Sequence, residues 1–133
     1  MNLKPIMLFI AFMGLVLYFA MNCSLIKDQA FQWVDKNPKS PDAPEILMRA
    51  GLWCSWTGGT QEAQQLFRAI WERYPEARPF SARALYEFAY IYSQGTARRN
   101  ANPYLERIFS EYEDQEKWRA KARELWDEVN HAL

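Results

Sequence analysis

The stretch Ile70–Ala77, IWERYPEA, recurs 38 residues later as Ile108–Gln115, IFSEYEDQ. Ile, an aromatic residue and Tyr stand at the same places in both copies. The same offset relates further pairs of positions, and all of them keep apolar or small character. The complete set is 47/85, 50/88, 51/89, 54/92, 63/101, 67/105, 70/108, 71/109 and 74/112. The chain therefore carries an internal repeat, which indicates stacked copies of one structural unit.

Each copy has the periodicity of two helices. Apolar positions recur at i, i+3, i+4 and i+7 in the first half and at i, i+4 and i+7 in the second, which is typical of amphipathic helices. The turn sequences TGGT (57–60) and SQGTARRN (93–100) separate the two halves. Thr60 and Asn100 are the expected N-caps of the second helices.

The repeat region is expected to cover residues 43–131. We place its copies at about 43–81 and 82–115, followed by a polar capping helix at 116–131. Before it, residues 27–42 are expected to hold a connecting helix and a Pro-rich linker. The stretch PKSPDAP (38–44) carries three prolines, which cannot lie in a helix interior and mark a new helix start. The connecting helix either continues the N-terminal segment outward or covers the first helix pair.

The N-terminal segment has a different composition. From Pro5 to Ile26 the chain has no charged side chain, and as a helix this span would reach roughly 33 Å, enough to cross a hydrocarbon core of about 30 Å. We expect a single-pass transmembrane anchor at 1–26, with membrane lipid around residues 5–26. Two alternatives are a cleaved signal peptide, which favours a shorter apolar core, and a lipid-modified Cys23, which Asn22 directly before it disfavours.

The repeat resembles the tetratricopeptide repeat, whose signature is a large then a small residue in the first helix, Ala and Phe in the second, and Pro at the exit. The first copy matches at Ala50-Gly51, Ala63, Phe67 and Pro75. The second keeps Phe88-Ala89 and Ala101, but Leu105 replaces Phe and Glu113 replaces Pro. The resemblance implies an all-α fold, a short α-solenoid of helix-turn-helix pairs after the membrane helix, with close helix approach at Gly51 and Ala89.

The composition disfavours several classes of function. Formal net charge is zero, without the basic excess of a nucleic-acid-binding protein. His131 is the only histidine, so triads and metal sites built on several histidines are excluded within one chain. Cys23 and Cys54 are expected to be two separate free thiols. We therefore expect no enzyme activity, no cofactor and no metal.

The resemblance implies a protein-protein interaction scaffold at the bacterial envelope, whose first helices line a groove. The predicted partner-binding residues on the groove face are Glu45, Met48, Leu52, Arg83, Tyr86 and Tyr90. Alternatively, this strip packs on the chain's own N-terminal helix.

A second hypothesis is a permanent accessory subunit of a larger membrane complex, such as an energy-transducing assembly, with partner contacts made by the membrane helix as well. The partners in both cases are proteins, with the repeats on the periplasmic side because Lys4 and the amino terminus favour the inside.

Overall fold

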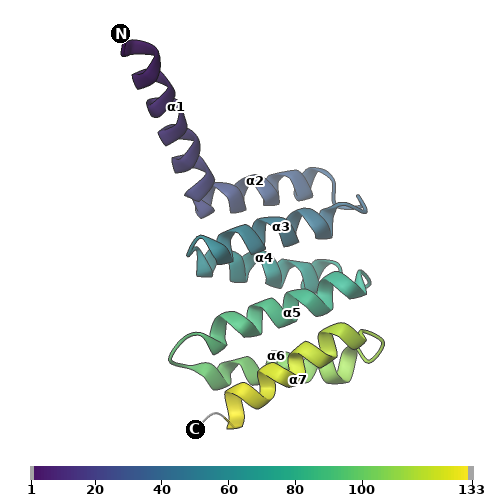
Figure 1. The fold of residues 1–133 in the computed structure, drawn as a ribbon. Helices are drawn as coiled ribbons and strands as arrows, with labels where there is room; N and C mark the ends of the chain where they lie inside the picture. The colour runs from purple at the N-terminus through teal and green to yellow at the C-terminus, as the bar shows by residue number, and fades with distance from the viewer. Residues whose placement is uncertain (1, 132–133) are drawn as a thin grey trace.

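In the computed structural model, the described residues, 2–131, form seven α-helices and one short 3₁₀ helix, with no β-strand among them. The helices are α1 (Lys4–Met21), α2 (Cys23–Lys36), α3 (Ala43–Trp56), α4 (Thr60–Arg73), α5 (Arg78–Ser93), η1 (Arg98–Ala101), α6 (Asn102–Glu111) and α7 (Glu116–His131) (Figure 1). The predicted all-α fold is confirmed.

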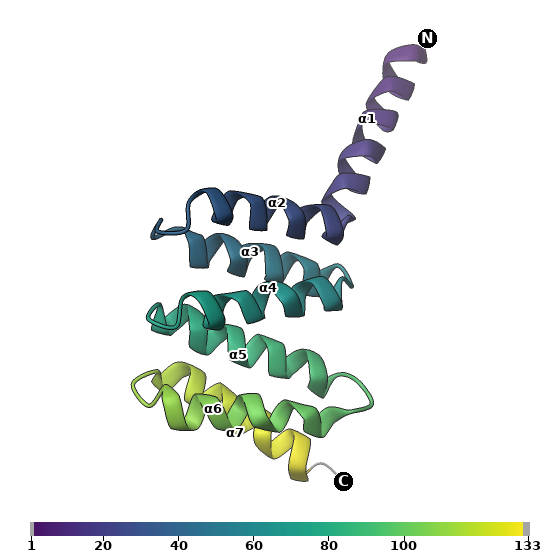
Figure 2. The same ribbon diagram turned by 180° about the vertical axis from the view of Figure 1, so that it is seen from behind.

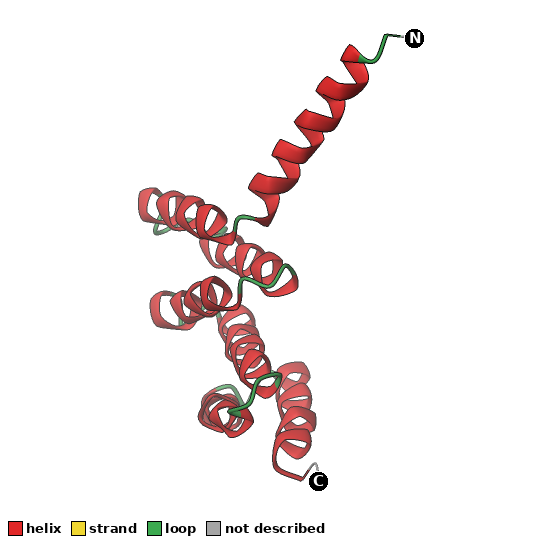
Figure 3. Ribbon diagram, turned by 90° about the vertical axis from the view of Figure 1, so that its left-hand side faces the viewer, coloured by secondary structure: helices red, strands yellow, loops and turns green. Residues whose placement is uncertain are grey.

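Helices α2 to α7 form one stack in chain order, each reversing direction from the one before (Figures 1 and 2). Viewed from the side, they fall into two staggered columns, while α1 projects away from the stack at an angle (Figure 3). Helices also contact their second neighbours along the chain, since α5 touches both α3 and α7, and α2 touches α4. One continuous core therefore runs along the stack.

The positions related by the sequence repeat are structurally equivalent in most pairs. Both members are buried at 47/85, 51/89, 63/101, 67/105 and 70/108. The residues that follow the second helices also match: Tyr74 after α4 and Tyr112 after α6 have nearly the same backbone angles. Asn37 at the end of α2 has these angles too, so α2 closes in the same way.

The segment predicted as a connecting helix is therefore a full member of the stack. Helix α2 begins at Cys23, before the predicted boundary at residue 27, and contacts both α3 and α4. Ala30 and Val34 are buried in the common core. The expectation that this helix covers the first pair is confirmed, and the alternative that it continues α1 is wrong.

The chain bends sharply at Asn22. The side chain of Asn22 accepts a hydrogen bond from the backbone N–H of Leu25 at 3.2 Å and so caps α2. Helices α1 and α2 meet at an angle of 64°. The predicted continuous apolar helix over 5–26 is wrong in its extent, because residues 23–26 belong to the first turn of α2.

Among the described residues, no single helix is long and apolar enough to pass as a membrane span, and only the bent pair of α1 and α2 meets the criteria of length and composition.

The TGGT turn holds the start of α2. Gly58 has a φ of 90°, a conformation that favours glycine. A Cβ on Gly59 would lie 2.6 Å from both Cβ and Sγ of Cys23, so the glycine allows close contact. The predicted N-caps are wrong: Thr60 is already the first residue of α4, and Asn100 lies within η1.

The corners between helices are tied to one another by polar contacts. Nε of Arg78 donates to both carboxylate oxygens of Asp114 at 3.1 and 3.0 Å, and Nη2 donates to the carbonyl of Glu111 at 2.9 Å. These bonds link the start of α5 to the turn between α6 and α7. One corner earlier, the hydroxyl of Tyr74 donates to the carbonyl of Pro38 at 2.9 Å.

The Arg78–Asp114 contact predicts a pH-dependent stability. The hydrogen bond from Arg78 holds the pKa of Asp114 well below its ordinary value. A lowered folded-state pKa stabilises the protein, and this contribution is complete above the unfolded pKa of about 3.9. It is lost progressively as the pH falls from the unfolded pKa toward the lower pKa of the folded state. Asp114→Asn should therefore lower the melting temperature at pH 7, by a small amount because both side chains are about half exposed.

Thermal unfolding at pH 7, 5 and 3, followed by circular dichroism, measures this effect. The difference in melting temperature between wild type and Asp114→Asn should persist at pH 5 and narrow at pH 3. Glu106→Gln, which changes another exposed carboxylate, should melt like wild type at all three pH values. A gap of equal size at all three values would show that Asp114 acts without its charge.

Candidate functional site

Four aromatic side chains gather on the column formed by α3, α5 and α7. We call Trp56, Tyr86, Tyr90 and Trp118 the aromatic face. The ring centroid of Tyr86 lies 6.3 Å from that of Tyr90 and 5.8 Å from that of Trp118. Trp56 is 74% exposed and Tyr90 is 43% exposed. Exposed rings of this size are a common feature of protein interaction sites.

Helical spacing puts these residues on one side of their helices. Tyr86 and Tyr90 are one turn apart in α5 and alternate with the buried pair Leu85 and Ala89, which faces the core. Trp56 is the last residue of α3. Because successive first helices pack side by side, their outward faces form one surface across the stack.

A hollow of about 210 Å³ lies between the ends of α3 and α5. It is lined by Ser55, Trp56, Thr60, Glu87, Tyr90, Ile91 and Gln94. Burial raises the pKa of the Glu87 carboxyl above its ordinary value, and the nearby Arg83, whose Nε lies 3.6 Å from Glu87 Oε1, opposes that shift. The hollow therefore combines two aromatic rings with a partly buried carboxylate.

The opposite end of the aromatic face is basic. Arg83 lies over the Trp118 ring at 5.4 Å, and the Lys117 ammonium lies 5.0 Å from the same centroid. Lys121 lies 5.8 Å from Trp118 and 5.9 Å from Tyr86. Such cation–π contacts occupy the rings at this end with the chain's own side chains. The Trp56–Tyr90 end is the more open one.

The structure brings together three of the six predicted binding residues. Arg83, Tyr86 and Tyr90 contact the same cluster, and Leu52 is half-buried against the core. Glu45 lies away from the hollow and pairs with Arg49 at 2.7 Å.

The placement of Met48 on the binding face is wrong, because its side chain is only 2% exposed and lies in the core. The alternative prediction was that the binding strip packs on the N-terminal helix. It is wrong for Tyr86, whose ring packs on Trp118 of α7.

Sequence reasoning missed Trp56, Glu87 and Trp118. Trp56 stands one turn after Leu52, the last predicted binding residue of this helix, and was within reach of the same periodic pattern. No local signal places Trp118 beside Tyr86, since that contact depends on how α7 packs on α5.

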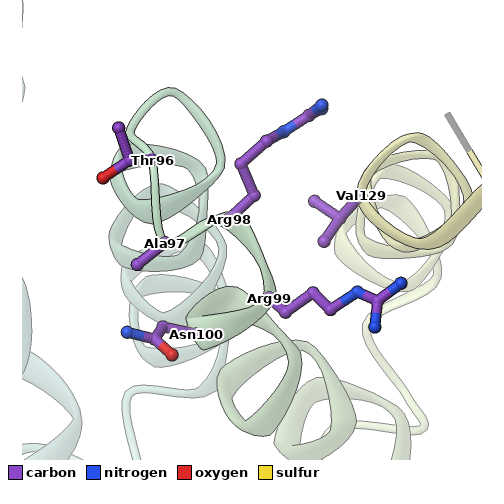
Figure 4. Close-up of a pocket in the computed structure, with 6 residues that line it drawn as sticks. All are labelled: Thr96, Ala97, Arg98, Arg99, Asn100 and Val129. Carbon is purple, nitrogen blue, oxygen red and sulfur yellow. The ribbon is translucent and has the colours of Figure 1, made fainter. Parts of the chain in front are cut away.

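A second hollow lies at the far end of the stack, between η1 and α7, with a volume of about 420 Å³. Figure 4 shows Arg98 and Arg99 reaching to either side of Val129. Arg98 Nε donates to the carbonyl of Ser93 at 3.0 Å, so this guanidinium holds the turn after α5. This hollow is therefore a weaker candidate than the aromatic face.

Among residues 2–131, no group of three or more His, Cys, Asp or Glu side chains is arranged to hold a metal ion.

Comparisons of the chain with protein-family models, with characterised proteins and with solved structures found no match.

Proposed function

We propose that this protein is a non-enzymatic, membrane-anchored scaffold that binds a partner protein through the aromatic face of a tetratricopeptide-like α-solenoid. The observation that carries the proposal is the exposure of Trp56 and Tyr90 beside a hollow on the helical stack. Aromatic side chains lose little conformational entropy on binding and dominate many interfaces.

The solenoid assignment is supported by the alternation of two kinds of helix. The ends of α2, α4 and α6 share one backbone conformation, and the helices that follow them, α3, α5 and α7, share one side of the stack. In tetratricopeptide proteins that side forms the binding groove. Each helix pair buries its apolar face only against its neighbours, which is the physical basis of a solenoid.

The chemistry of the hollow defines the partner segment. A helical or extended peptide with a Lys or Arg side chain fits best, because its aliphatic stem would pack on Trp56 and Tyr90 while its charge meets Glu87. A positive charge from the partner would add to the compensation that Arg83 already gives the partly buried Glu87 carboxylate. The basic side chains around Trp118 favour an acidic residue further along the same segment.

The membrane anchor in this proposal is α1. Its large apolar side chains from Ile6 to Phe19 are exposed on all sides, a surface far larger than a water-facing patch normally presents. Its 18 residues span about 27 Å, a few ångströms less than a typical hydrocarbon core, a mismatch that local bilayer thinning can absorb. Lys4 at its start favours a cytoplasmic amino terminus and a periplasmic stack.

The anchor is tested by extraction of membranes with alkaline carbonate. Wild type should stay in the pellet, whereas Leu8→Lys with Phe12→Lys should move to the supernatant, because each charge is costly in hydrocarbon. Gln29→Lys with Gln32→Lys adds the same charge to the exposed side of α2 and should stay in the pellet. Extraction of the wild type, or an intact mass showing cleavage after residue 20 or lipid on Cys23, would contradict the proposal.

A further inference from the structure

We infer that Cys23 and Cys54 form a redox-sensitive pair that closes into a disulfide joining the start of α2 to the end of α3. This inference is independent of the proposed partner binding. The sequence predicts two separate thiols, and both cysteines are free in the structure. They are nevertheless neighbours in space, although they are 31 positions apart in the chain.

The contacts around the pair place the two side chains together. Sγ of Cys54 donates to the carbonyl oxygen of Cys23 at 3.8 Å, and the nearby Cys23 thiol contributes to the raised pKa of the Cys54 thiol. Sγ of Cys23 lies 3.2 Å from Oγ1 of Thr57, one turn of chain beyond Cys54. Gly59 also packs closely on Cys23, since an added Cβ would collide with Cβ and Sγ of Cys23. Cys23 therefore sits in a fitted position against the end of α3.

The same environment controls when the pair can react. Desolvation by burial, followed by the neighbouring Cys23, raises the pKa of the Cys54 thiol well above its ordinary value. Because the thiolate is the species that attacks, the closed native pair reacts slowly. Oxidation is expected during folding or when the start of α2 opens, and the finished bond is then shielded from reductants.

The reaction is a thiol–disulfide exchange with a small disulfide oxidant. One cysteine thiolate attacks the oxidant and forms a mixed disulfide, releasing one small thiol. The second cysteine, as thiolate, then attacks the sulfur of the first and releases the other small thiol. The protein loses two electrons and two protons, which reduce the oxidant to two thiols.

The bond would close the loop from residue 23 to residue 54 and fix the start of α2 on the stack. Since only Asn22 separates α2 from α1, the crosslink would also fix the direction in which α1 leaves the stack. With the pair reduced, the start of α2 is held on the stack by packing alone. The pair is thus a redox-dependent staple at the junction of anchor and stack.

The test uses full-length protein in detergent, reduced and unfolded in urea, then refolded in buffers of defined reduced to oxidised glutathione ratio. After acid quenching, denaturation and alkylation with iodoacetamide, intact mass counts the free thiols. Wild type should become a monomer that carries neither iodoacetamide label nor glutathione. Proteolysis should then yield a fragment in which Cys23 is joined to Cys54 by a disulfide. Dithiothreitol should restore two labels.

Two further variants keep the result interpretable. Gly59→Ala, which crowds Cys23, should lower the equilibrium constant for closure by about tenfold, whereas Gly95→Ala, whose added Cβ meets only ordinary contacts, should match wild type. Cys54→Ser should leave one thiol that takes up glutathione. Wild type that retains two free thiols, or carries two glutathione adducts at every ratio, would overturn the inference.

Discussion

Gly51→Leu should destabilise the protein by about 1–3 kcal/mol or more, because the site has no room for a side chain. A Cβ built on Gly51 would lie 2.6 Å from Cε1 and 2.9 Å from Cδ1 of Phe67. Phe67 is fully buried in α4, so its ring cannot turn toward solvent. Helix α3 would have to move away from α4, and the loss of packing would spread to both neighbours.

Urea unfolding of the full-length protein in detergent, followed by helical circular dichroism, measures this loss. Ala89→Leu, at the equivalent buried position of α5, should be destabilised in the same direction. Gly95→Leu lies in the open turn after α5 and should stay near wild type. Unchanged midpoints for both Gly51→Leu and Ala89→Leu would mean that the two repeats are not packed as described.

Trp56→Ala combined with Tyr90→Ala should abolish partner binding while leaving the helical content intact. Both rings are substantially exposed, so their removal opens no cavity in the core. Truncation of an aromatic hot spot typically costs about 2 kcal/mol or more, which for each ring corresponds to a rise of about thirtyfold in Kd. Trp33→Ala removes a similarly exposed ring from α2 and should leave binding unchanged.

Purification from membranes in mild detergent identifies the protein that remains bound, and a titration of the purified pair then gives Kd for each variant. Glu87→Gln should weaken a partner that inserts a Lys or Arg, and raised salt should have a modest effect because most of the contact is apolar. A partner lost on α1 substitution but retained by the double aromatic variant would instead indicate a permanent subunit held through the membrane helix.

The repeat and its helices could be predicted because apolar spacing is a local property of the sequence. The positions 47, 51, 63, 67 and 70 face the core in the way that helical periodicity requires. The end of α1 was missed because a run of apolar residues continues past Asn22, while the bend depends on a single capping side chain. The local pattern therefore predicted an apolar helix in this segment but not the break that ends it at Met21.

The candidate site was predicted only in part, since a helix face has boundaries that sequence alone does not define. Met48 lies one residue from the buried Leu47, and the packing of neighbouring helices decides that it is covered. Tyr86 and Tyr90 followed from their phase in α5. Trp118 and the burial of Glu87 depend on contacts between distant segments, which no local pattern contains.

Photo-crosslinking in intact membranes tests the central claim, that the aromatic face of the anchored chain contacts a partner protein. A photoreactive amino acid is placed at Trp56 or Tyr90 and, as a matched control, at Glu72 on the exposed side of α4. We expect one discrete protein adduct from positions 56 and 90, competed by the purified partner segment, and none from position 72. Adducts from position 72 alone, or equal adducts from all three positions, would contradict the account.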